Sequence, residues 1–389
     1  MTKEQVMFGL LRREICGDTV ELGQWQTDHE QLSARLLSLY RLSKSHDVAH
    51  LVADALADMG LLGQDEVSAR FKKQQMLAVY RYENLNYELE SVCQALEKEK
   101  ISFLPLKGSV IRVFYPAPWM RTSCDIDILV HEEELDRATS VLEASLGYVL
   151  KERSSHDISL FSPGGVHLEL HFNLIEEVRY PVAVAILSDV WQYATSVKED
   201  SYRYVLSDEM FYFYHIAHMA KHFESGGCGV RPFLDLWILE HRLEHDREKR
   251  NALLAKGGLL TFAEVCRQLT EVWFSGLESD PLTEEFGRFV LDGGVYGTVE
   301  NNIIVNQQKK GGRVRYVWSR LFVPYEILKD RYPILRKHPV LLPVCQLRRW
   351  AGMIKGGRLE RSVEELRLSG KISQTQEQST AELLSRIGL

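Results

Sequence analysis

The sequence has no uninterrupted run of about 18 apolar residues, the length that a membrane-spanning helix needs. Its six cysteines are scattered and form no Cys-x-x-Cys pair, which excludes a disulfide framework and a zinc ribbon. The N-terminus lacks the long apolar segment of a secretory signal peptide. We therefore expect a protein of the reducing cytoplasm that has no membrane span.

A strong excess of one charge is also missing. The 389 residues include 47 Lys and Arg and 54 Asp and Glu, which gives a formal net charge of −7. This balance argues against dominant nonspecific binding of nucleic acid, although it leaves room for a local basic site. With 45% hydrophobic and 26% charged residues, the composition is that of an ordinary globular protein.

Hydrophobic patterns divide the chain into three regions. Residues 1–99 show helical spacing, and a single long helix is expected over 71–100. In residues 100–206, the spacing of the apolar residues alternates between that of helices and that of strands. The predicted strands are 101–106, 125–130, 148–151, 158–161 and 166–172, and the predicted helices are 109–115 and 132–146. From Ser207, a plausible helix cap, residues 207–389 are mainly helical. We predict an α+β fold in which helical regions flank a small mixed sheet.

Two acidic residues stand out in the segment 125–130. Asp125 and Asp127 are two positions apart, so in a strand they project from the same face, while Ile126 and Ile128 face a core. Carboxylate oxygens are the ligands that Mg²⁺ prefers, and two of them on one strand form a suitable seat for it. The alternative for an isolated Asp-x-Asp is a solvated strand end.

Other residues complete a longer pattern around this strand. Lys107-Gly108-Ser109 precedes it, and Tyr115-Pro116 and Arg121 lie between the two. This order resembles the nucleotidyltransferase fold of polymerase-beta-type and aminoglycoside-modifying enzymes. It is more similar still to a group of bacterial proteins known only as uncharacterised nucleotidyltransferases. The similarity continues through the segments 167–171 and 231–235 and covers roughly residues 100–350.

The resemblance implies a divalent-metal-dependent transfer of a nucleoside monophosphate from an NTP, with ATP the expected donor. Asp125 and Asp127 would bind Mg²⁺ or Mn²⁺, and Glu169 on a later strand would complete the metal site or act as a base. The alternative for Glu169 is an exposed strand acid. The acceptor hydroxyl stays unidentified: a sugar, another small molecule, a peptide or protein, and RNA are all open.

The same resemblance implies a phosphate-binding role for the turn before the strand. Gly108 would let the backbone approach a phosphate, and Ser109 would add a hydroxyl at a helix N-terminus. Lys107 and Arg121 could neutralise phosphate charge or be surface residues, and Gly108-Ser109 could be an ordinary helix start. The segment 115–122 is longer than the corresponding gap in better-known transferases, so their acceptor preference is not carried over.

Three alternative functions remain open at this stage. The same fold could serve as a noncatalytic nucleotide-binding or regulatory module. A kinase-like variant would transfer the γ-phosphoryl group instead of the nucleotidyl group. A metal-dependent hydrolase could use two histidine-rich faces, one on the strand 166–172 and one on a helix. The histidines concerned are His167, His171, His215, His218 and His222.

Overall fold

The computed structural model describes residues 1–23, 25, 29–174, 181–355, 365 and 367–389. Internal contacts divide the chain into two compact units. The first comprises Met1–Lys221, Gly229–Gly287 and Gly388, and the second comprises His222–Cys228, Arg288–Ile387 and Leu389. The predicted region boundaries after residues 99 and 206 lie inside the first unit and stay predictions.

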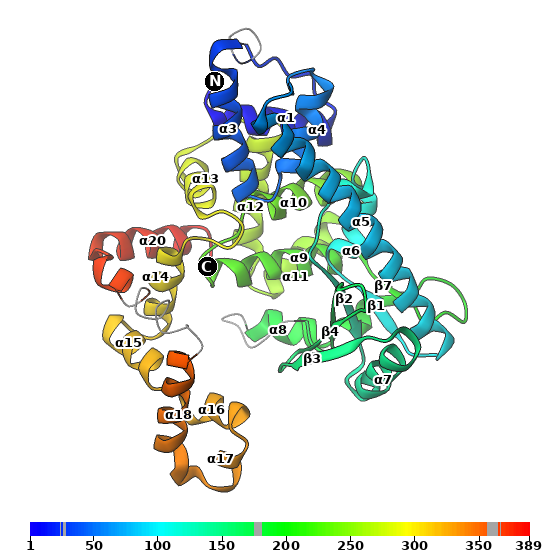
Figure 1. The fold of residues 1–389 in the computed structure, drawn as a ribbon, viewed down its shortest axis with the longest axis vertical. Coiled ribbons are helices and arrows are strands. Elements are labelled where there is room, and N and C mark those ends of the chain that lie inside the picture. Colours follow the sequence, from blue (N-terminus) through cyan, green and yellow to red (C-terminus); the bar gives the residue numbers. More distant parts are fainter. Residues whose placement is uncertain (24, 26–28, 175–180, 356–364, 366) are drawn as a thin grey trace. The chain divides into compact units, whose positions relative to one another are not determined.

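A five-stranded mixed sheet lies in the first unit, with the strand order β1-β2-β5-β4-β3 (Figure 1). Its strands are β1 (Phe103–Pro105), β2 (Asp125–Val130), β3 (Val149–Arg153), β4 (Asp157–Phe161) and β5 (His167–His171). Only the β2–β5 pair of this sheet is parallel. A two-stranded sheet is formed by β6 (Ala194–Ser196) and β7 (Tyr204–Leu206). The predicted α+β class with a small mixed sheet is confirmed.

Several helices precede the sheet in the part of the chain that the structure describes. They are α1 (Lys3–Cys16), α3 (His29–Ser45), α4 (Ala49–Asp58) and α5 (Glu66–Lys98). The predicted long helix is present as α5, but it begins five residues earlier than expected. Asp65 explains the earlier start, because its side chain accepts hydrogen bonds from the amides of Val67 and Ser68 and so caps the first turn.

One face of the five-stranded sheet packs against α5 and α7 (Leu135–Leu146). The alternating apolar residues of β2, β4 and β5 all contribute to this core. They are Ile126, Ile128, Val130, Ile158, Leu160, Leu168 and Leu170. The predicted end of α7 is also found, because Gly147 follows it in the left-handed conformation with φ 69°. The polar residues of β2 and β5 are therefore left on the opposite face.

The predicted helix over 109–115 is much shorter in the structure. A single α-helical turn, α6 (Gly108–Ile111), is followed by a 3₁₀ turn over Arg112–Phe114. Tyr115 is extended, with ψ 155°, as expected for a residue that precedes a proline. The segment then continues through Pro116 towards β2. The α-helix therefore does not extend over the whole predicted range.

The C-terminal part is mainly helical, as predicted. The described helices are α9 (Asp208–Phe223), α10 (Val230–Arg242), α11 (Arg247–Lys256), α12 (Leu260–Phe274), α13 (Pro281–Gly293), α14 (Val299–Lys309), α15 (Arg313–Leu321), α16 (Tyr325–Arg331), α17 (Ile334–Lys337), α18 (Leu342–Lys355) and α20 (Gln374–Arg386). Another helix, α8 (Pro181–Ser188), lies before them, within the predicted region 100–206. Ser207 caps α9 as expected, since its hydroxyl accepts from the Met210 amide at 3.3 Å. Among the described residues, no helix is long and apolar enough to cross a membrane.

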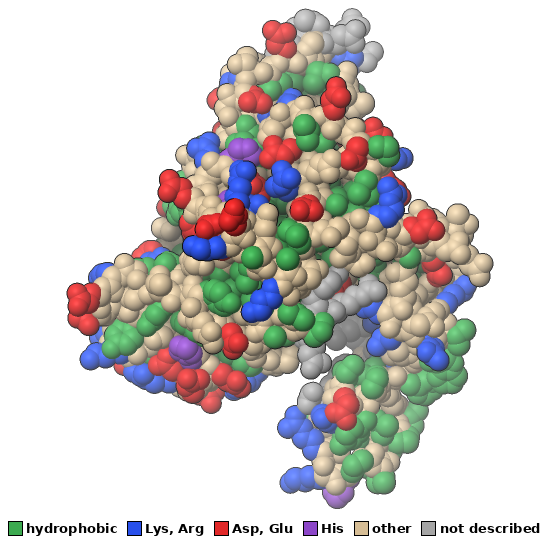
Figure 2. All heavy atoms as spheres, turned by 180° about the vertical axis from the view of Figure 1, so that it is seen from behind, with side chains coloured by type: hydrophobic (Ala, Val, Ile, Leu, Met, Phe, Trp, Pro, Cys, Tyr) green, Lys and Arg blue, Asp and Glu red, His purple; other side chains and the backbone are tan. Residues whose placement is uncertain are grey.

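A basic and apolar surface lies in the second unit, over α17 and α18. Residues 331–355 contain six Lys or Arg and no acidic residue. Val340 is 85% exposed and Leu347 is 60% exposed. Figure 2 shows hydrophobic side chains beside Lys and Arg at the lower end of the view, where Figure 1 places these helices. Positive charge and exposed aliphatic side chains are therefore combined there, in a chain whose net charge is negative.

Candidate active site

The parallel pairing of β2 with β5 brings the predicted acidic residues together. Asp127 lies directly opposite Glu169, and Asp125 lies opposite His167. Because side chains alternate along both strands, all of these polar side chains project from the face that is not packed on α5 and α7. Two segments about 40 positions apart in sequence thus form one polar cluster.

Potential ligand atoms in this cluster are close enough to share a cation. One group comprises Asp125, His167 and Glu169, and another comprises Asp127, Glu169 and His171. Within each group the ligand atoms lie within 4.8 Å of one another. Glu169 belongs to both groups, so it links the two aspartates of β2. The arrangement could hold a divalent metal ion.

Asp127 is the most strongly engaged of the three acids. Its Oδ1 accepts from Lys107 Nζ at 2.7 Å and from His171 Nε2 at 2.9 Å. The residue is only 3% exposed. Burial alone would raise the pKa of this carboxyl, but the Lys107 ammonium and the His171 hydrogen bond lower it well below its usual range. Asp127 is therefore ionised at neutral pH.

The two partners of Asp127 are shifted in the opposite direction. Burial favours the neutral form of Lys107, yet the Asp127 charge raises the pKa of this amine above its usual value. Burial likewise opposes protonation of His171, while hydrogen bonds to Asp127 and Glu169 raise its pKa. Lys107 thus provides a fixed positive charge at the site.

The carboxyl group of Asp125 experiences mainly electrostatic repulsion. Burial raises the pKa of its carboxyl, and the negative charges of Asp127 and Glu169 raise it further. Like charges crowded in this way destabilise each other unless a cation lies between them. The site therefore has a local excess of negative charge despite the presence of Lys107.

A strained turn positions Lys107. Its φ of 46° and ψ of −121° are those of the first central residue in a type II′ turn, which favours glycine. The turn is closed by a hydrogen bond from the Ser109 amide to the Leu106 carbonyl at 3.1 Å. The Leu106 amide donates to the Asp127 carbonyl at 3.0 Å, which ties the turn to β2. Strain of this kind, of order 1–3 kcal/mol, is typical of functional positions.

Gly108 and Ser109 have local structural partners. The amides of Ser109 and Val110 donate to the Leu106 and Lys107 carbonyls. A Cβ added to Gly108 would lie 3.3 Å from Arg121 Nη1 and from the Cβ and Oγ of Ser123. The close packing of Gly108 against these residues is a structural reason for glycine, separate from the predicted approach of a phosphate.

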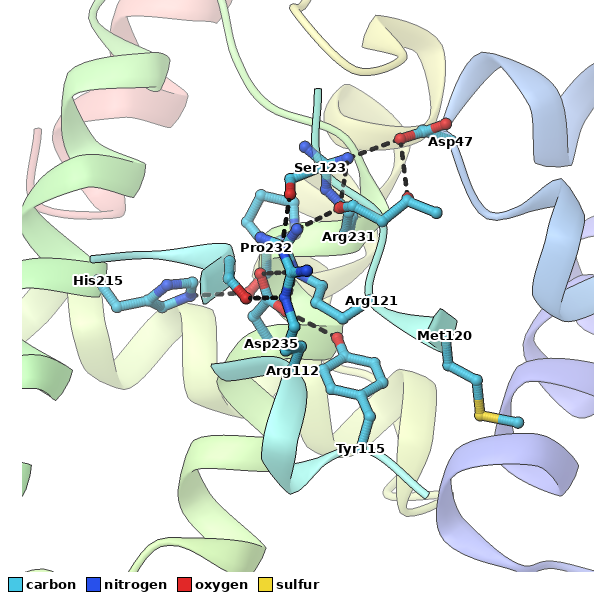
Figure 3. Close-up of polar contacts among 12 residues, drawn as sticks. Asp47, Arg112, Tyr115, Met120, Arg121, Ser123, His215, Arg231, Pro232 and Asp235 are labelled. Atoms are coloured by element: carbon cyan, nitrogen blue, oxygen red, sulfur yellow. Dashed lines mark hydrogen bonds and ion pairs between the residues drawn. The ribbon is translucent and has the colours of Figure 1, made fainter. Parts of the chain in front are cut away.

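Arg121 lies in a buried ion pair with a residue of α10. Its Nε is 2.7 Å from Asp235 Oδ1 and 2.9 Å from Oδ2. The Tyr115 hydroxyl donates to the same Oδ1 at 2.7 Å. Figure 3 shows Tyr115 and Arg121 converging on Asp235. Both side chains come from the segment between α6 and β2, so this ion pair fixes that segment against α10.

A neighbouring contact joins the same segment to the N-terminal helices. Arg231 Nη1 lies 2.6 Å from Asp47 Oδ2, which also accepts from the Thr122 hydroxyl at 3.3 Å. His50 Nε2 is 2.8 Å from the Met120 carbonyl oxygen. Arg231 and Asp235 thus belong to two separate ion pairs, the first with Asp47 and the second with Arg121 (Figure 3). The segment before β2 is therefore held both by α10 and by the N-terminal helices.

The second histidine-rich face does not join the carboxylate cluster. His215 is partly buried, and its Nε2 lies 2.9 Å from the Pro232 carbonyl oxygen. In the part of the chain that the structure describes, no group of three potential ligands combines the α9 histidines with those of β5. The arrangement gives no support to a hydrolase site built from both faces.

Tyr214 is a residue of the site that the sequence analysis missed. It is 2% exposed, and its hydroxyl has no hydrogen-bond partner among the described residues. Burial raises the pKa of the phenol, and Asp127, Glu169 and Asp125 raise it further while Lys107 lowers it. Tyr214 of α9 is therefore close enough to these charged groups to interact with them electrostatically. No local motif could reveal it, because it lies far from β2 and β5 in sequence.

A small mixed sheet that pairs an Asp-x-Asp strand with a strand carrying a third acid has the arrangement expected of the nucleotidyltransferase class. The sequence model of the family described as "uncharacterised nucleotidyltransferase" matches residues 34–275, more than half of the chain. The protein belongs to this family. No curated protein and no solved structure matches it.

Proposed function

We propose that this protein transfers a nucleoside monophosphate from an NTP, with ATP the expected donor, to a hydroxyl group of an acceptor. The observation that carries the proposal is the parallel register that places Asp127 opposite Glu169, with Asp125 on the same face. Membership of the family supports the reaction class. The donor and the acceptor are part of the proposal.

The donor set fits a hard divalent cation, Mg²⁺ or Mn²⁺. Asp125, Asp127 and Glu169 would hold it, since carboxylate oxygens are its preferred ligands. Both hydrogen bonds to Asp127 use Oδ1, so Oδ2 would be the oxygen that binds the cation. The repulsion felt by Asp125 would be relieved in the same way. When bound, such a cation stabilises charge on phosphate oxygens and favours ionisation of a hydroxyl.

Lys107 is the residue proposed to hold the phosphate chain. Its ammonium lies at the carboxylate cluster, 2.7 Å from Asp127 Oδ1, and a strained turn keeps it there. Gly108 and Ser109 continue the same turn, and the Ser109 hydroxyl could donate to a phosphate oxygen. Arg121 would act indirectly, because its guanidinium is committed to Asp235. It would position the segment that leads into β2.

The proposed reaction joins the acceptor to the α-phosphorus of the NTP. The acceptor oxygen forms a bond to this phosphorus, the bond from phosphorus to the bridging oxygen breaks, and pyrophosphate leaves. The hydroxyl proton passes to a carboxylate. Glu169 is the proposed base, because its side chain is 25% exposed and can be reached, whereas Asp127 is almost fully buried and hydrogen-bonded.

Label transfer from NTP tests this function. With Mg²⁺ and fractionated cell extract as the source of acceptors, label from an α-phosphate should reach an acceptor, whereas label from a γ-phosphate should leave as pyrophosphate. Asp125→Ala should reduce the transfer by at least about 1000-fold while the fold remains intact. Glu133→Ala, which removes an exposed acid just after β2, is the control and should be active.

Each other outcome identifies an alternative. Transfer of γ-label to an acceptor would indicate a kinase-like reaction at the same site. Nucleotide binding without any transfer would indicate a noncatalytic module. Full activity of Asp125→Ala would contradict the assignment of the site itself.

A further inference from the structure

A third group of potential metal ligands lies beside the carboxylate cluster. It comprises His156, Asp157 and His171, with ligand atoms within 4.8 Å of one another. Asp157 of β4 is directly opposite His171 of β5. The His156 carbonyl accepts from the amides of Phe172 and Asn173 at 3.0 and 3.2 Å. The backbone therefore holds all three residues at the same end of the β4–β5 pair.

The two ring nitrogens of His171 have different environments. Nε2 lies 2.9 Å from Asp127 Oδ1, and because a carboxylate only accepts, Nε2 carries a proton. Nδ1 is buried and has no hydrogen-bond partner among the described residues. In the neutral ring Nδ1 is thus an unused electron-pair donor in a side chain that is only 3% exposed. A histidine that binds a metal through one nitrogen usually donates its other N–H to a carboxylate or carbonyl.

His156 and Asp157 are oriented by a shared partner, Ser154. The Ser154 hydroxyl lies 3.0 Å from His156 Nδ1 and donates to Asp157 Oδ1. His156 Nε2 and Asp157 Oδ2 then face each other at 3.5 Å. Their side chains are 15% and 16% exposed. Ser154 therefore holds one polar atom of each residue, and the other two atoms lie next to each other.

The rings of His156 and His171 are also suitably placed for a shared ion. Their centroids are 6.0 Å apart, with 37° between the ring planes. A shared cation could account for this proximity without a direct hydrogen bond between the rings. A cation between the two nitrogens and the Asp157 oxygen would satisfy the buried Nδ1 of His171, which costs free energy when it is left unpartnered.

We propose that His156, Asp157 and His171 form a binding site for a divalent transition metal of the zinc type. Two imidazole nitrogens and one carboxylate suit such an ion better than Mg²⁺, which prefers oxygen ligands. The site shares no ligand with the proposed Mg²⁺ site of Asp125, Asp127 and Glu169. It does not rest on the proposed reaction. A metal bound there would fix the His171 ring, and through it the Asp127 carboxylate.

Cobalt binding provides the test, because Co²⁺ in a nitrogen-containing site has a visible ligand-field absorption. Chelator-treated protein is titrated with Co²⁺ in excess Mg²⁺, without nucleotide. The wild type should bind one Co²⁺ at this site, and Zn²⁺ should displace it. His156→Ala and Asp157→Asn should each weaken binding by about 10- to 100-fold. Asp157→Asn retains the size of the side chain, so weaker binding by this variant would not be caused by misfolding.

Two control variants distinguish Co²⁺ binding at this site from binding at the proposed Mg²⁺ site. His241→Ala removes a histidine that stacks on Trp237, and Asp125→Ala removes an oxygen ligand of the Mg²⁺ site. Both should bind Co²⁺ as the wild type does. Loss of binding in Asp125→Ala with retention in His156→Ala would place the ion at the carboxylates and overturn the proposal. Absence of the absorption from the wild type would overturn it too, whatever the nucleotide experiments show.

Discussion

At the scale of single residues, the site depends on how each charge is partnered. Asp127 has two hydrogen-bond donors on one oxygen and stays ionised, whereas Asp125 has two negative neighbours. Because Asp127 is already ionised, a cation can bind there without displacing a proton. Arg121, in contrast, is paired with Asp235 in the interior.

Arg121→Met should lower the free energy of unfolding by about 3 kcal/mol, because it leaves the buried Asp235 carboxylate without its counter-charge. Adding Asp235→Leu should restore much of that loss. Arg70→Ala breaks an exposed ion pair with Glu66 and should have little effect. Urea unfolding followed by tryptophan fluorescence measures all of these variants. If Arg121 instead binds phosphate directly, Arg121→Met should lose nucleotide affinity at unchanged stability.

His50 should make stability depend on pH. Burial lowers the pKa of its imidazole from 6.5 to about 4 in the folded protein. Below pH 6.5 the unfolded chain therefore binds a proton that the folded protein does not. The free energy of unfolding should fall as the pH drops from about 6.5 to 4, with a contribution from His50 of about 3 kcal/mol.

His50→Gln isolates this contribution, because the glutamine amide can still donate to the Met120 carbonyl. Urea unfolding at a series of pH values should show a smaller decline for the variant than for the wild type. Parallel curves over pH 6.5 to 4 would show that His50 is not the responsible group.

At the scale of elements, the strands and their faces could be predicted because alternation with a period of two is a local property. The sequence therefore indicated that Asp125 and Asp127 share a face, and that Glu169 lies on the polar face of its own strand. The length of α6 could not be judged in this way. It ends at Ile111, where a 3₁₀ turn follows up to Phe114, and helical spacing does not distinguish these two kinds of turn.

Partners far apart in sequence were the other limit. Arg121 and Asp235 are 114 positions apart, and Tyr214 reaches the site from α9. Hydrophobic periodicity shows that such helices have buried faces, but not which side chains meet across them. The resemblance to nucleotidyltransferases supplied the pairing of β2 with a later acidic strand. It did not supply the roles of Tyr214, His156 or Asp157.

Gly108→Ala tests the packing of α6 against the segment before β2. The added Cβ would contact Ser123 and Arg121 at 3.3 Å. These neighbours cannot easily move, since Arg112 holds the Ser123 hydroxyl at 2.9 Å and Asp235 holds Arg121. We expect a loss of about 1–2 kcal/mol in the free energy of unfolding.

Gly352→Ala in α18 is the matched control, because no atom lies within 4 Å of its added Cβ. This variant should be unchanged or slightly more stable, as alanine favours a helix over glycine. An equal effect of the two substitutions in urea unfolding would show that the packing around Gly108 is not tight.

At the scale of the whole molecule, the proposed catalytic chemistry lies in the first unit. The strand pair β2–β5 supplies the acids, the turn at Lys107 supplies the positive charge, and α9 and α10 supply Tyr214 and Asp235. The second unit adds a basic and apolar surface over α17 and α18 whose role is not part of the proposed chemistry. The central claim is that the carboxylates of β2 bind NTP through a divalent metal.

Calorimetry of ATP binding, with and without Mg²⁺, tests this claim most directly. The wild type should bind ATP in a Mg²⁺-dependent manner, and Asp125→Ala with Asp127→Ala should lose that dependence, even if Lys107 still attracts phosphate. Glu132→Ala with Glu133→Ala removes two exposed acids just after β2 and should bind as the wild type does. Equal Mg²⁺-dependent binding by the wild type and the aspartate double variant would contradict the account.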